Sequence, residues 1–506
     1  MDVFKAPSCL LVLLSLLGQP YAGNAQGSEP PPRRDVQHWR EDLRVLSDAI
    51  REKHRDPFHQ VTRQQFDAAV AQLDRRIPKL EPYAVIAELA RLVALLQDGH
   101  TRLTLPVSRH QLGLYQGHSN DPPANDDFEH FHVLPLRLYL YDDGLFVRQA
   151  TAEHRSLAGA KVVQIGTKTA AEALAAIRPF IPIENESSFR LVAPTRLAIP
   201  EMLAAAGIVT EIDPVRFVFE TAQGRRTEHA LAALPRDGEP EWVHARDLTG
   251  APAPLWAQNN DAWYWFEHLP AADAVYVQLN RIGSHADESL SEFVERLVAL
   301  IEAQSIDRVI LDLRHNSGGN GYLNRTLVLA LIRWQKAIEP GHLYVITGRK
   351  TFSAAIQLCT ALEQYTQVTF VGEEIGGKTS HYGDSRKTIL PHSGLTLRTS
   401  TVYWRDWSVD ENRGSIVLDL PAPLTSGDDS GGHDPALAAA LGHELPRDRL
   451  KQLVAVDQQS GFDSATVALY RQMTDIAAGG RHAAEGVKGF ASHLAKTGRL
   501  QEARFL

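Results

Sequence analysis

The sequence predicts an α/β core, in which a parallel-rich sheet carries crossover helices, together with an N-terminal helical domain, a β-rich region and a helical C-terminal tail. Three observations predict this arrangement. Apolar residues recur at helical spacing through residues 35–105. Residues 130–235 contain short segments in which apolar and polar residues alternate, as in strands. From Ala274 onward strand and helix patterns alternate, which indicates parallel strands joined by helices.

Length and charge narrow the classes of function. The chain has 506 residues, of which 44% are hydrophobic, so it is long enough for several domains with their own cores. Its formal net charge is −9, and it contains no long basic run. This composition gives no electrostatic footprint for nucleic acid or for an anionic membrane surface.

The N-terminal segment, residues 1–25, resembles a secretory signal peptide. Lys5 precedes an apolar run from Cys9 to Leu17, and small residues follow at Ala22 and Ala25. The run is too short to span a bilayer. We therefore expect an exported protein, periplasmic or secreted, without stable membrane insertion.

The N-terminal helical domain, residues 35–105, is expected to contain three helices. The first is centred on Trp39 to Ile50, and the second begins at a Thr62/Gln65 capping box. The third ends at Asp98-Gly99, where glycine is a natural C-terminal cap, and His100 follows at once.

The middle of the chain is expected to be rich in loops and strands. Residues 106–130 are polar and predict a surface loop. Leu134 to Val147 predicts a hairpin about Asp143-Gly144, and Lys161 to Ile165 and Val215 to Phe219 predict further strands within the β-rich region, residues 130–235.

The α/β domain, residues 262–440, supplies the remaining core. Its expected strands are Val275–Leu279, Val309–Leu313, Leu343–Thr347 and Val368–Val371, with helices around Phe293, from Tyr322 to Trp334 and after Ser353. Sites in such sheets gather beyond the carboxyl ends of the strands. Beyond the core, residues 455–506 predict a helical extension, whose last part looks like half of a tetratricopeptide unit and could bind a partner protein.

Two glycine-rich turns fall at these strand ends. The first contains Ser317-Gly318-Gly319, and the second places Ser353 at the start of a helix, with Lys378 after the next strand. A serine hydroxyl, backbone N–H groups and a nearby base are the components of acyl transfer. The alternative role of Ser353 is an ordinary helix N-cap.

The same residues resemble the tail-specific, or C-terminal processing, serine peptidase family (S41-type). The similarity lies in the segments RVILDLRHNSGG, TFSAA and GEEIGG. The resemblance implies Ser353 as nucleophile and Lys378 as base, since their separation along the chain is that of the family's serine and lysine. It also implies oxyanion donors at Gly318 or Gly319 and at Ala354, a crotonase-like core, and a reduced PDZ-like module in the β-rich region.

The general base has two candidates. A glutamine usually follows the family lysine by four positions, whereas Tyr382 stands there in this chain. In the tricorn-like branch the base is a histidine from the N-terminal part, in a turn similar to Asp98-Gly99-His100-Thr101. Histidine needs only a small change of pKa to act near neutrality. His100 and Lys378 therefore both remain candidates.

Two other patterns, a chymotrypsin-type serine segment and a zinc-binding histidine motif, give no support for a different chemistry. Asp429-Ser430-Gly431-Gly432 resembles a chymotrypsin-type serine segment but lies in a polar loop without the matching all-β chain. The 21 histidines include no His-Glu-x-x-His pattern, so we expect neither a metal nor another cofactor.

The sequence thus predicts an exported serine endopeptidase that hydrolyses polypeptide substrates through an acyl-enzyme at Ser353. The alternative is a non-catalytic protein that binds ligands or peptides on the same scaffold, as in the retinoid-binding branch of the family.

Overall fold

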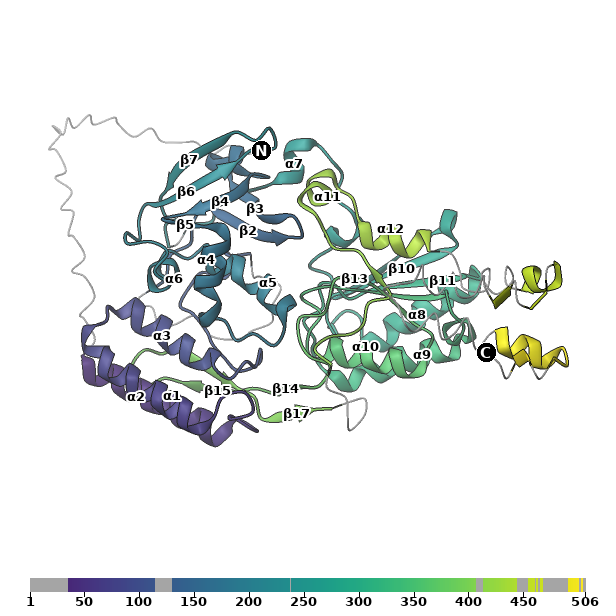
Figure 1. The fold of residues 1–506 in the computed structure, drawn as a ribbon, viewed down its shortest axis with the longest axis horizontal. Coiled ribbons are helices and arrows are strands. Elements are labelled where there is room, and N and C mark those ends of the chain that lie inside the picture. The colour runs from purple at the N-terminus through teal and green to yellow at the C-terminus, as the bar shows by residue number, and fades with distance from the viewer. Residues whose placement is uncertain are drawn as a thin grey trace, which may run out of the picture. The chain divides into compact units, whose positions relative to one another are not determined.

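The computed structural model describes residues 35–113, 130–236, 238–405 and 413–443, and short pieces of the C-terminal extension at 454–459, 461–462, 465–466, 490–499 and 502–503. All of them belong to the unit of the chain that begins at residue 34. Figure 1 labels its helices and strands. The expected signal peptide and most of the expected polar loop lie outside the described residues. None of the described helices is long and apolar enough to cross a membrane.

Three helices open the described chain, as the sequence predicts. They are α1 (Val36–Lys53), α2 (Arg63–Arg76) and α3 (Pro82–Ala94), with a short 3-10 turn η1 (Ile77–Lys79) after α2. The capping box at the start of α2 is present, since the Thr62 and Gln65 side chains each accept a hydrogen bond from the other's backbone N–H.

The end of α3 differs from the prediction. The helix stops at Ala94, and the residue with left-handed backbone is Gln97, with φ 50°, so Gly99 is not the cap. Close packing favours glycine at position 99 for another reason. A Cβ there would lie 3.0 Å from the Glu184 carboxylate and 3.0 Å from the Phe352 ring.

The β-rich region is built on a seven-stranded antiparallel sheet. Five strands follow the order β2-β3-β4-β6-β7, while β5 pairs with β4 and β8 with β3. The strands are β2 (Leu136–Tyr141), β3 (Gly144–Thr151), β4 (Lys161–Ile165), β5 (Lys168–Thr169), β6 (Val215–Glu220), β7 (Arg226–Leu231) and β8 (Trp242–His244).

Helices that the sequence analysis did not predict also lie in this region. They are η2 (Ala152–Leu157), α4 (Ala170–Ile177), η3 (Arg178–Phe180), α5 (Glu186–Arg196), α6 (Pro200–Ala205) and α7 (Ala245–Thr249). Helix α5 starts at a capping box formed by Asn185 and Ser188, and it packs against β2. Pro194 lies inside this helix, which conceals the helical pattern in the sequence.

The α/β core is a six-stranded sheet in the order β18-β13-β12-β11-β10-β9, parallel throughout except for β9. Its strands are β9 (Tyr264–Leu269), β10 (Ala274–Leu279), β11 (Arg308–Asp312), β12 (Leu343–Thr347), β13 (Thr369–Gly372) and β18 (Leu420–Pro421). The four predicted core strands are confirmed within one residue at each end.

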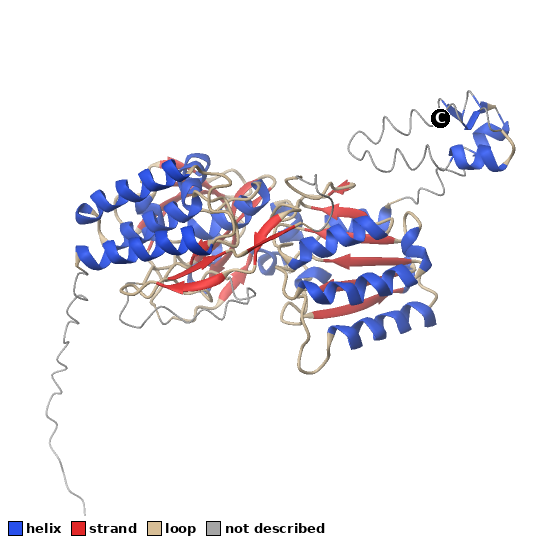
Figure 2. Cartoon of the chain, turned by 90° about the horizontal axis from the view of Figure 1, so that it is seen from below, coloured by secondary structure: helices blue, strands red, loops and turns tan. Residues whose placement is uncertain are grey.

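Helices cover this sheet (Figure 2). They are α8 (Leu290–Ala303), α9 (Asn324–Arg333), α10 (Ala354–Tyr365) and α12 (Pro435–Gly442), with short turns η4 (Leu255–Ala257), η5 (Pro270–Ala272), η6 (Gly321–Leu323) and η7 (Gln335–Ile338). Successive residues of each strand point to opposite faces of the sheet and belong to two separate hydrophobic clusters. Val275 and Leu311 pack with α8, α9 and α10, whereas Tyr276 and Ile310 pack with α12.

Two small sheets connect distant parts of the chain. The first has the order β1-β16-β15, and the second pairs β14 with β17. Their strands are β1 (Arg102–Leu103), β14 (His381–Gly383), β15 (Arg386–Ile389), β16 (Thr396–Thr399) and β17 (Val402–Trp404). Because Arg102 pairs with Arg398, the segment that follows His100 is fixed to the second half of the chain.

The mixed α/β character with several sheets is therefore confirmed. The division into separate domains, and the PDZ-like and crotonase-like assignments, stay predictions.

Candidate active site

Ser353 lies at the turn between β12 and α10, beyond the carboxyl end of a parallel strand. Its backbone has φ 55° and ψ −125°, a conformation that is strained for any residue except glycine. The side chain occupies the N-cap position but makes no capping hydrogen bond. The strained backbone and the missing capping hydrogen bond argue against an ordinary N-cap role for this partly buried serine.

The first glycine-rich turn lies directly against this serine. A Cβ on Gly318 would approach the Ser353 Cβ to 2.8 Å and the Ala354 backbone nitrogen to 2.9 Å. A Cβ on Gly319 would collide with the Ile282 carbonyl oxygen at 2.0 Å. Both glycines have positive φ, 103° and 139°, so no side chain fits here in conformation or in space.

Asn316 organises the backbone N–H groups of this turn. Its Oδ1 accepts the Gly318 N–H at 2.8 Å, and its Nδ2 donates to the Leu279 carbonyl at 2.8 Å. The Gly318 N–H is therefore already engaged. Within the described chain the N–H groups of Gly319 and Ala354 donate to no backbone or side-chain acceptor, and they remain as donors for an oxyanion.

His100 packs beside the nucleophile turn. Its ring stacks on Phe352 with centroids 4.3 Å apart, and on His381 at 5.5 Å. His100 Nδ1 is buried without a hydrogen-bond partner among the described residues. Burial, reinforced by His381, lowers the pKa of His100 to about 3. The imidazole is therefore neutral but only weakly basic in this arrangement, in contrast to the small change of pKa expected for a histidine base.

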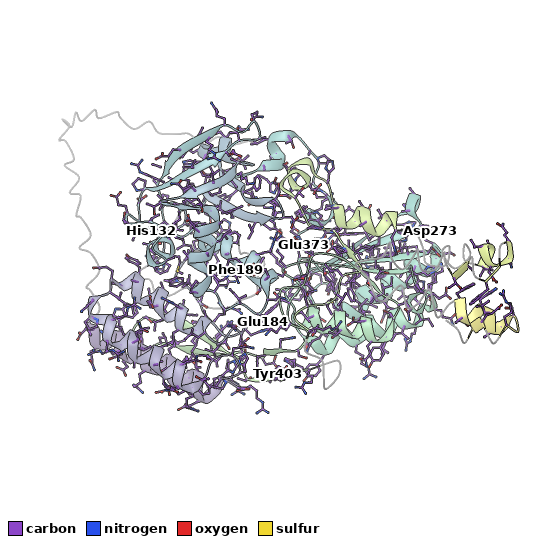
Figure 3. The ribbon with its side chains drawn as sticks, viewed as in Figure 1. His132, Glu184, Phe189, Asp273, Glu373 and Tyr403 are labelled. Carbon is purple, nitrogen blue, oxygen red and sulfur yellow. The ribbon has the colours of Figure 1, made fainter. Side chains whose placement is uncertain are left out.

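Glu184, labelled in Figure 3, joins the segments that carry both candidate bases. Its Oε1 accepts the Gly99 N–H at 2.8 Å, and its Oε2 accepts the Lys378 N–H at 3.1 Å. Burial, with the charge of Asp98 as the next cause, raises the pKa of Glu184 to about 8. Neither Glu184 nor His381 was identified from the sequence.

Lys378 follows a tightly packed glycine pair. A Cβ on Gly377 would lie 2.9 Å from the Phe352 ring and 3.1 Å from Ile356 Cδ1. Lys378 itself is partly buried. Among the described residues, the Ser353 hydroxyl hydrogen-bonds to neither Lys378 nor His100. The structure thus places the segments that carry His100 and Lys378 against Phe352. Neither of these described side chains is hydrogen-bonded to the Ser353 hydroxyl.

A second buried pair stands behind His100. His54 Nε2 lies 3.0 Å from Asp98 Oδ2, and the His100 N–H donates to Asp98 Oδ1 at 2.9 Å. Burial alone would raise the pKa of Asp98, but the hydrogen bond to His54 lowers it below its ordinary value. Asp98 therefore presents a negative charge to the His100 turn.

Asp98, His100 and Glu184 could also hold a metal ion, because one ligand atom of each lies within 4.8 Å of the others. Their carboxylate oxygens already accept the hydrogen bonds of His54, His100, Gly99 and Lys378. We therefore assign the cluster to positioning the turn.

Two minor motifs are structural. Asp429 is fully buried and pairs with Arg148 at 3.0 Å, while Ser430 only donates to the Gly427 carbonyl within α11 (Ser426–Gly431). Asp312 accepts the Arg314 N–H at 2.9 Å, which supports the prediction that these two residues hold the glycine-rich loop.

Structures of mature CPAF show the same fold. One, complexed with lactacystin, has a TM-score of 0.55 and 11% identity over 83% of this chain and 98% of that chain. Another has a TM-score of 0.53 and 12% identity over 84% and 98%.

Other comparisons are weaker. The photosystem II D1 C-terminal processing protease has a TM-score of 0.35 and 14% identity over 79% of this chain and 98% of its own. No protein-family profile matches the sequence, and no curated protein matches it. At identities this low the comparisons with solved structures show the fold, and the chemistry has to be argued from the residues.

Proposed function

We propose that this chain is an exported serine endopeptidase that hydrolyses polypeptides through an acyl-enzyme at Ser353. One observation carries the proposal: Ser353 is held in a strained turn with an uncapped hydroxyl, next to the unengaged N–H groups of Gly319 and Ala354. Export is proposed from the N-terminal segment up to Ala25, which resembles a signal peptide.

The reaction follows from these positions. Ser353 Oγ attacks the scissile carbonyl while the base takes its proton, and the Gly319 and Ala354 N–H groups stabilise the oxyanion. The base then gives the proton to the leaving amine as the peptide C–N bond breaks. Water, deprotonated by the same base, hydrolyses the ester and restores the serine.

His100 is the base that the geometry supports better. Its ring is neutral and stacks on the residue next to Ser353, and the carboxylate of Asp98 stabilises the imidazolium that forms. Lys378 remains the alternative, because its segment contacts the same Phe352 ring through Gly377. A rotation of either side chain has to complete its hydrogen bond with Ser353 when substrate binds.

The test compares hydrolysis of an unfolded protein by the wild type, Ser353→Ala, His100→Ala and Lys378→Ala. Loss of the nucleophile should lower kcat by at least about a thousandfold. Ser430→Ala is the matched control and should keep full activity, because the Ser430 hydroxyl bonds only to the Gly427 carbonyl of its own helix. Whichever base variant loses activity as severely as Ser353→Ala identifies the base.

A fluorophosphonate probe gives a second readout, since it labels an activated serine without turnover of a peptide. Labelling should disappear in Ser353→Ala and persist in Ser430→Ala. Equal hydrolysis by the wild type and Ser353→Ala would refute the proposal. In that case a binding protein on the same scaffold would be the better interpretation.

A further inference from the structure

Three adjoining cavities, of about 80, 230 and 250 Å³, lie beside the candidate active site. Leu191 and Lys350 line all three, so the cavities adjoin one another. The 230 Å³ cavity is also lined by Ser317 and Phe352, which immediately precede Gly318 and Ser353. Groups of a substrate near its scissile bond therefore have direct access to these cavities.

The cavity walls are rich in cations, and several of these are neutralised by carboxylates. The neutralised pairs are Arg148 with Asp429 at 3.0 Å, Arg314 with Asp434 at 2.9 Å and with Asp312 at 2.8 Å, and Arg349 with Glu373 at 2.6 Å. These ion pairs hold the walls together and leave little net charge of their own.

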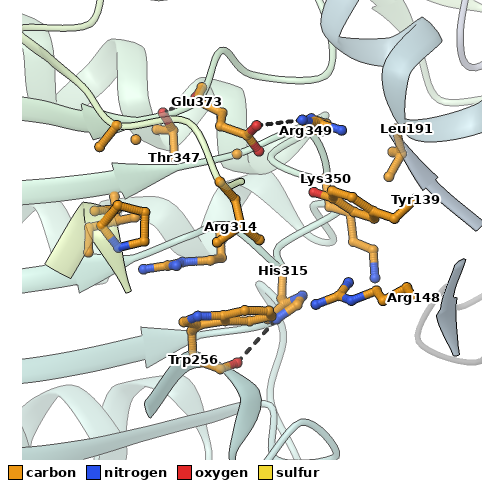
Figure 4. Close-up of a pocket in the computed structure, with 17 residues that line it drawn as sticks. Tyr139, Arg148, Leu191, Trp256, Arg314, His315, Thr347, Arg349, Lys350 and Glu373 are labelled. Carbon is orange, nitrogen blue, oxygen red and sulfur yellow. Dashed lines mark hydrogen bonds and ion pairs between the residues drawn. The ribbon is translucent and has the colours of Figure 1, made fainter. Parts of the chain in front are cut away.

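Lys350 and Arg196 are different. Within the described part of the chain neither side chain has an ion-pair partner, and the buried Arg196 Nε has no hydrogen-bond partner at all. Figure 4 shows Lys350 extending into the smallest of the three cavities towards Arg148, while Glu373 is engaged by Arg349. Two partly buried positive charges thus border the cleft without a counter-charge.

Their surroundings confirm that the charges are uncompensated. Burial, reinforced by Arg148, lowers the pKa of Lys350 to about 8. Burial, reinforced by Arg102, lowers the pKa of Arg196 to about 10. Both groups are still positive at neutral pH. A cation removed from water without a partner costs free energy, which an anionic ligand recovers.

We propose that the cavities lined by both Lys350 and Arg196 are a subsite that receives an acidic side chain of the polypeptide substrate close to the scissile bond. Both residues line the 230 and 250 Å³ cavities, and apolar side chains such as Val93, Phe180 and Val192 receive the carbon chain that carries the carboxylate. The inference rests on the proposed peptidase function and specifies its substrate class. An acidic side chain of the substrate supplies the carboxylate.

Binding to the inactive Ser353→Ala variant tests the subsite without cleavage. The probes are short peptides of one neutral sequence, amidated at the C-terminus, with a single Glu or its matched Gln at each position in turn. A further peptide has a free C-terminal carboxylate. We expect Glu at one position to tighten binding roughly tenfold or more, as charge-assisted hydrogen bonds do. A preference for the free C-terminal carboxylate alone would refute an acidic side chain as the occupant. Equal affinity for all the peptides would refute the subsite.

Variants then assign the preference to residues. Lys350→Gln and Arg196→Gln should each reduce the preference for the acidic peptide, and Lys350→Arg should keep it. Arg216→Gln is the control, because Arg216 is exposed on β6 and pairs with Glu228 at 3.0 Å. Lys350→Glu should favour peptides with Lys at the selected position. If a glutamine variant fails to fold, the comparison of peptides on the Ser353→Ala background still decides.

Cleavage by the wild type separates this inference from the proposed function. If no peptide is cleaved but the carboxylate preference persists, the peptidase proposal fails and the subsite stands. If all peptides are bound equally and cleaved with equal kcat/KM, the subsite is refuted and the peptidase proposal stands.

Discussion

Replacing Glu184 by glutamine tests how the two base-carrying segments are held. The carboxylate accepts the N–H groups of Gly99 and Lys378, and its pKa is raised to about 8. An ordinary glutamate titrates near about 4.3. Between these two values the folded protein keeps a proton that the unfolded chain has lost. The stabilisation from Glu184 is therefore complete below about pH 4.3 and disappears as the pH rises through 8.

The magnitude follows from this linkage. One proton changes the free energy of unfolding by at most about 1.4 kcal/mol per pH unit, so the wild type should lose up to about 3.4 kcal/mol between pH 5 and 7.5 from this group. Partial exposure of the Glu184 side chain reduces that value. Glutamine cannot ionise, but its amide nitrogen faces one of the two backbone N–H donors. Leaving that donor unpaired should cost about 1–3 kcal/mol at every pH.

Urea unfolding of both proteins at pH 5, 6, 7, 8 and 9 measures these effects. Glu184→Gln should be less stable than the wild type at pH 5, and the difference should shrink or reverse by pH 9. Glu228→Gln, at an exposed residue of β7, is the control and should parallel the wild type. If the curves for Glu184→Gln and the wild type run parallel across this range, Glu184 does not carry the proton and our account of its role in holding the two segments is wrong.

Three further perturbations have defined outcomes. Gly318→Ala should abolish peptide hydrolysis and lower the melting temperature by several degrees, because its Cβ would lie 2.8 Å from the Ser353 Cβ; a fully active, equally stable variant would contradict this packing. Arg314→Leu should lower the free energy of unfolding by about 3–5 kcal/mol in urea titrations, since it leaves the buried carboxylate of Asp312 unpaired, and adding Asp312→Leu should recover part of the loss. Dialysis against a chelator should leave hydrolysis unchanged, because the carboxylates of the Asp98 cluster already accept protein hydrogen bonds; metal-dependent recovery of activity would show otherwise.

Features encoded by short-range pattern could be predicted from the sequence. The core strands and the helix after Ser353 follow from apolar periodicity, and the glycines at 318 and 319 follow from the turn between strand and helix. The strained backbone of Ser353 could not be predicted, because serine is also a favoured N-cap residue.

Features that depend on long-range contacts were missed. Glu184 lies 85 residues from Gly99 and 194 from Lys378, and its own segment carries no periodic or motif signal. Lys350 and Arg196 come from different regions, and only the folded chain brings them to the same cavities. Gly99 was assigned to a helix cap because local propensity favours that role, whereas the close approach of the Phe352 and Glu184 side chains is what favours glycine there.

The pairing of β1 with β16 has a consequence for biosynthesis. His100 is translated early, but the strand that fixes its segment ends only at Thr399, far along the chain. A ribosome that has already released Ser353 still holds a nascent chain without this anchor, and contacts of such sequence separation form late in folding. If His100 is the base, the growing polypeptide cannot digest itself or its neighbours until almost all of the sheet-forming sequence has emerged.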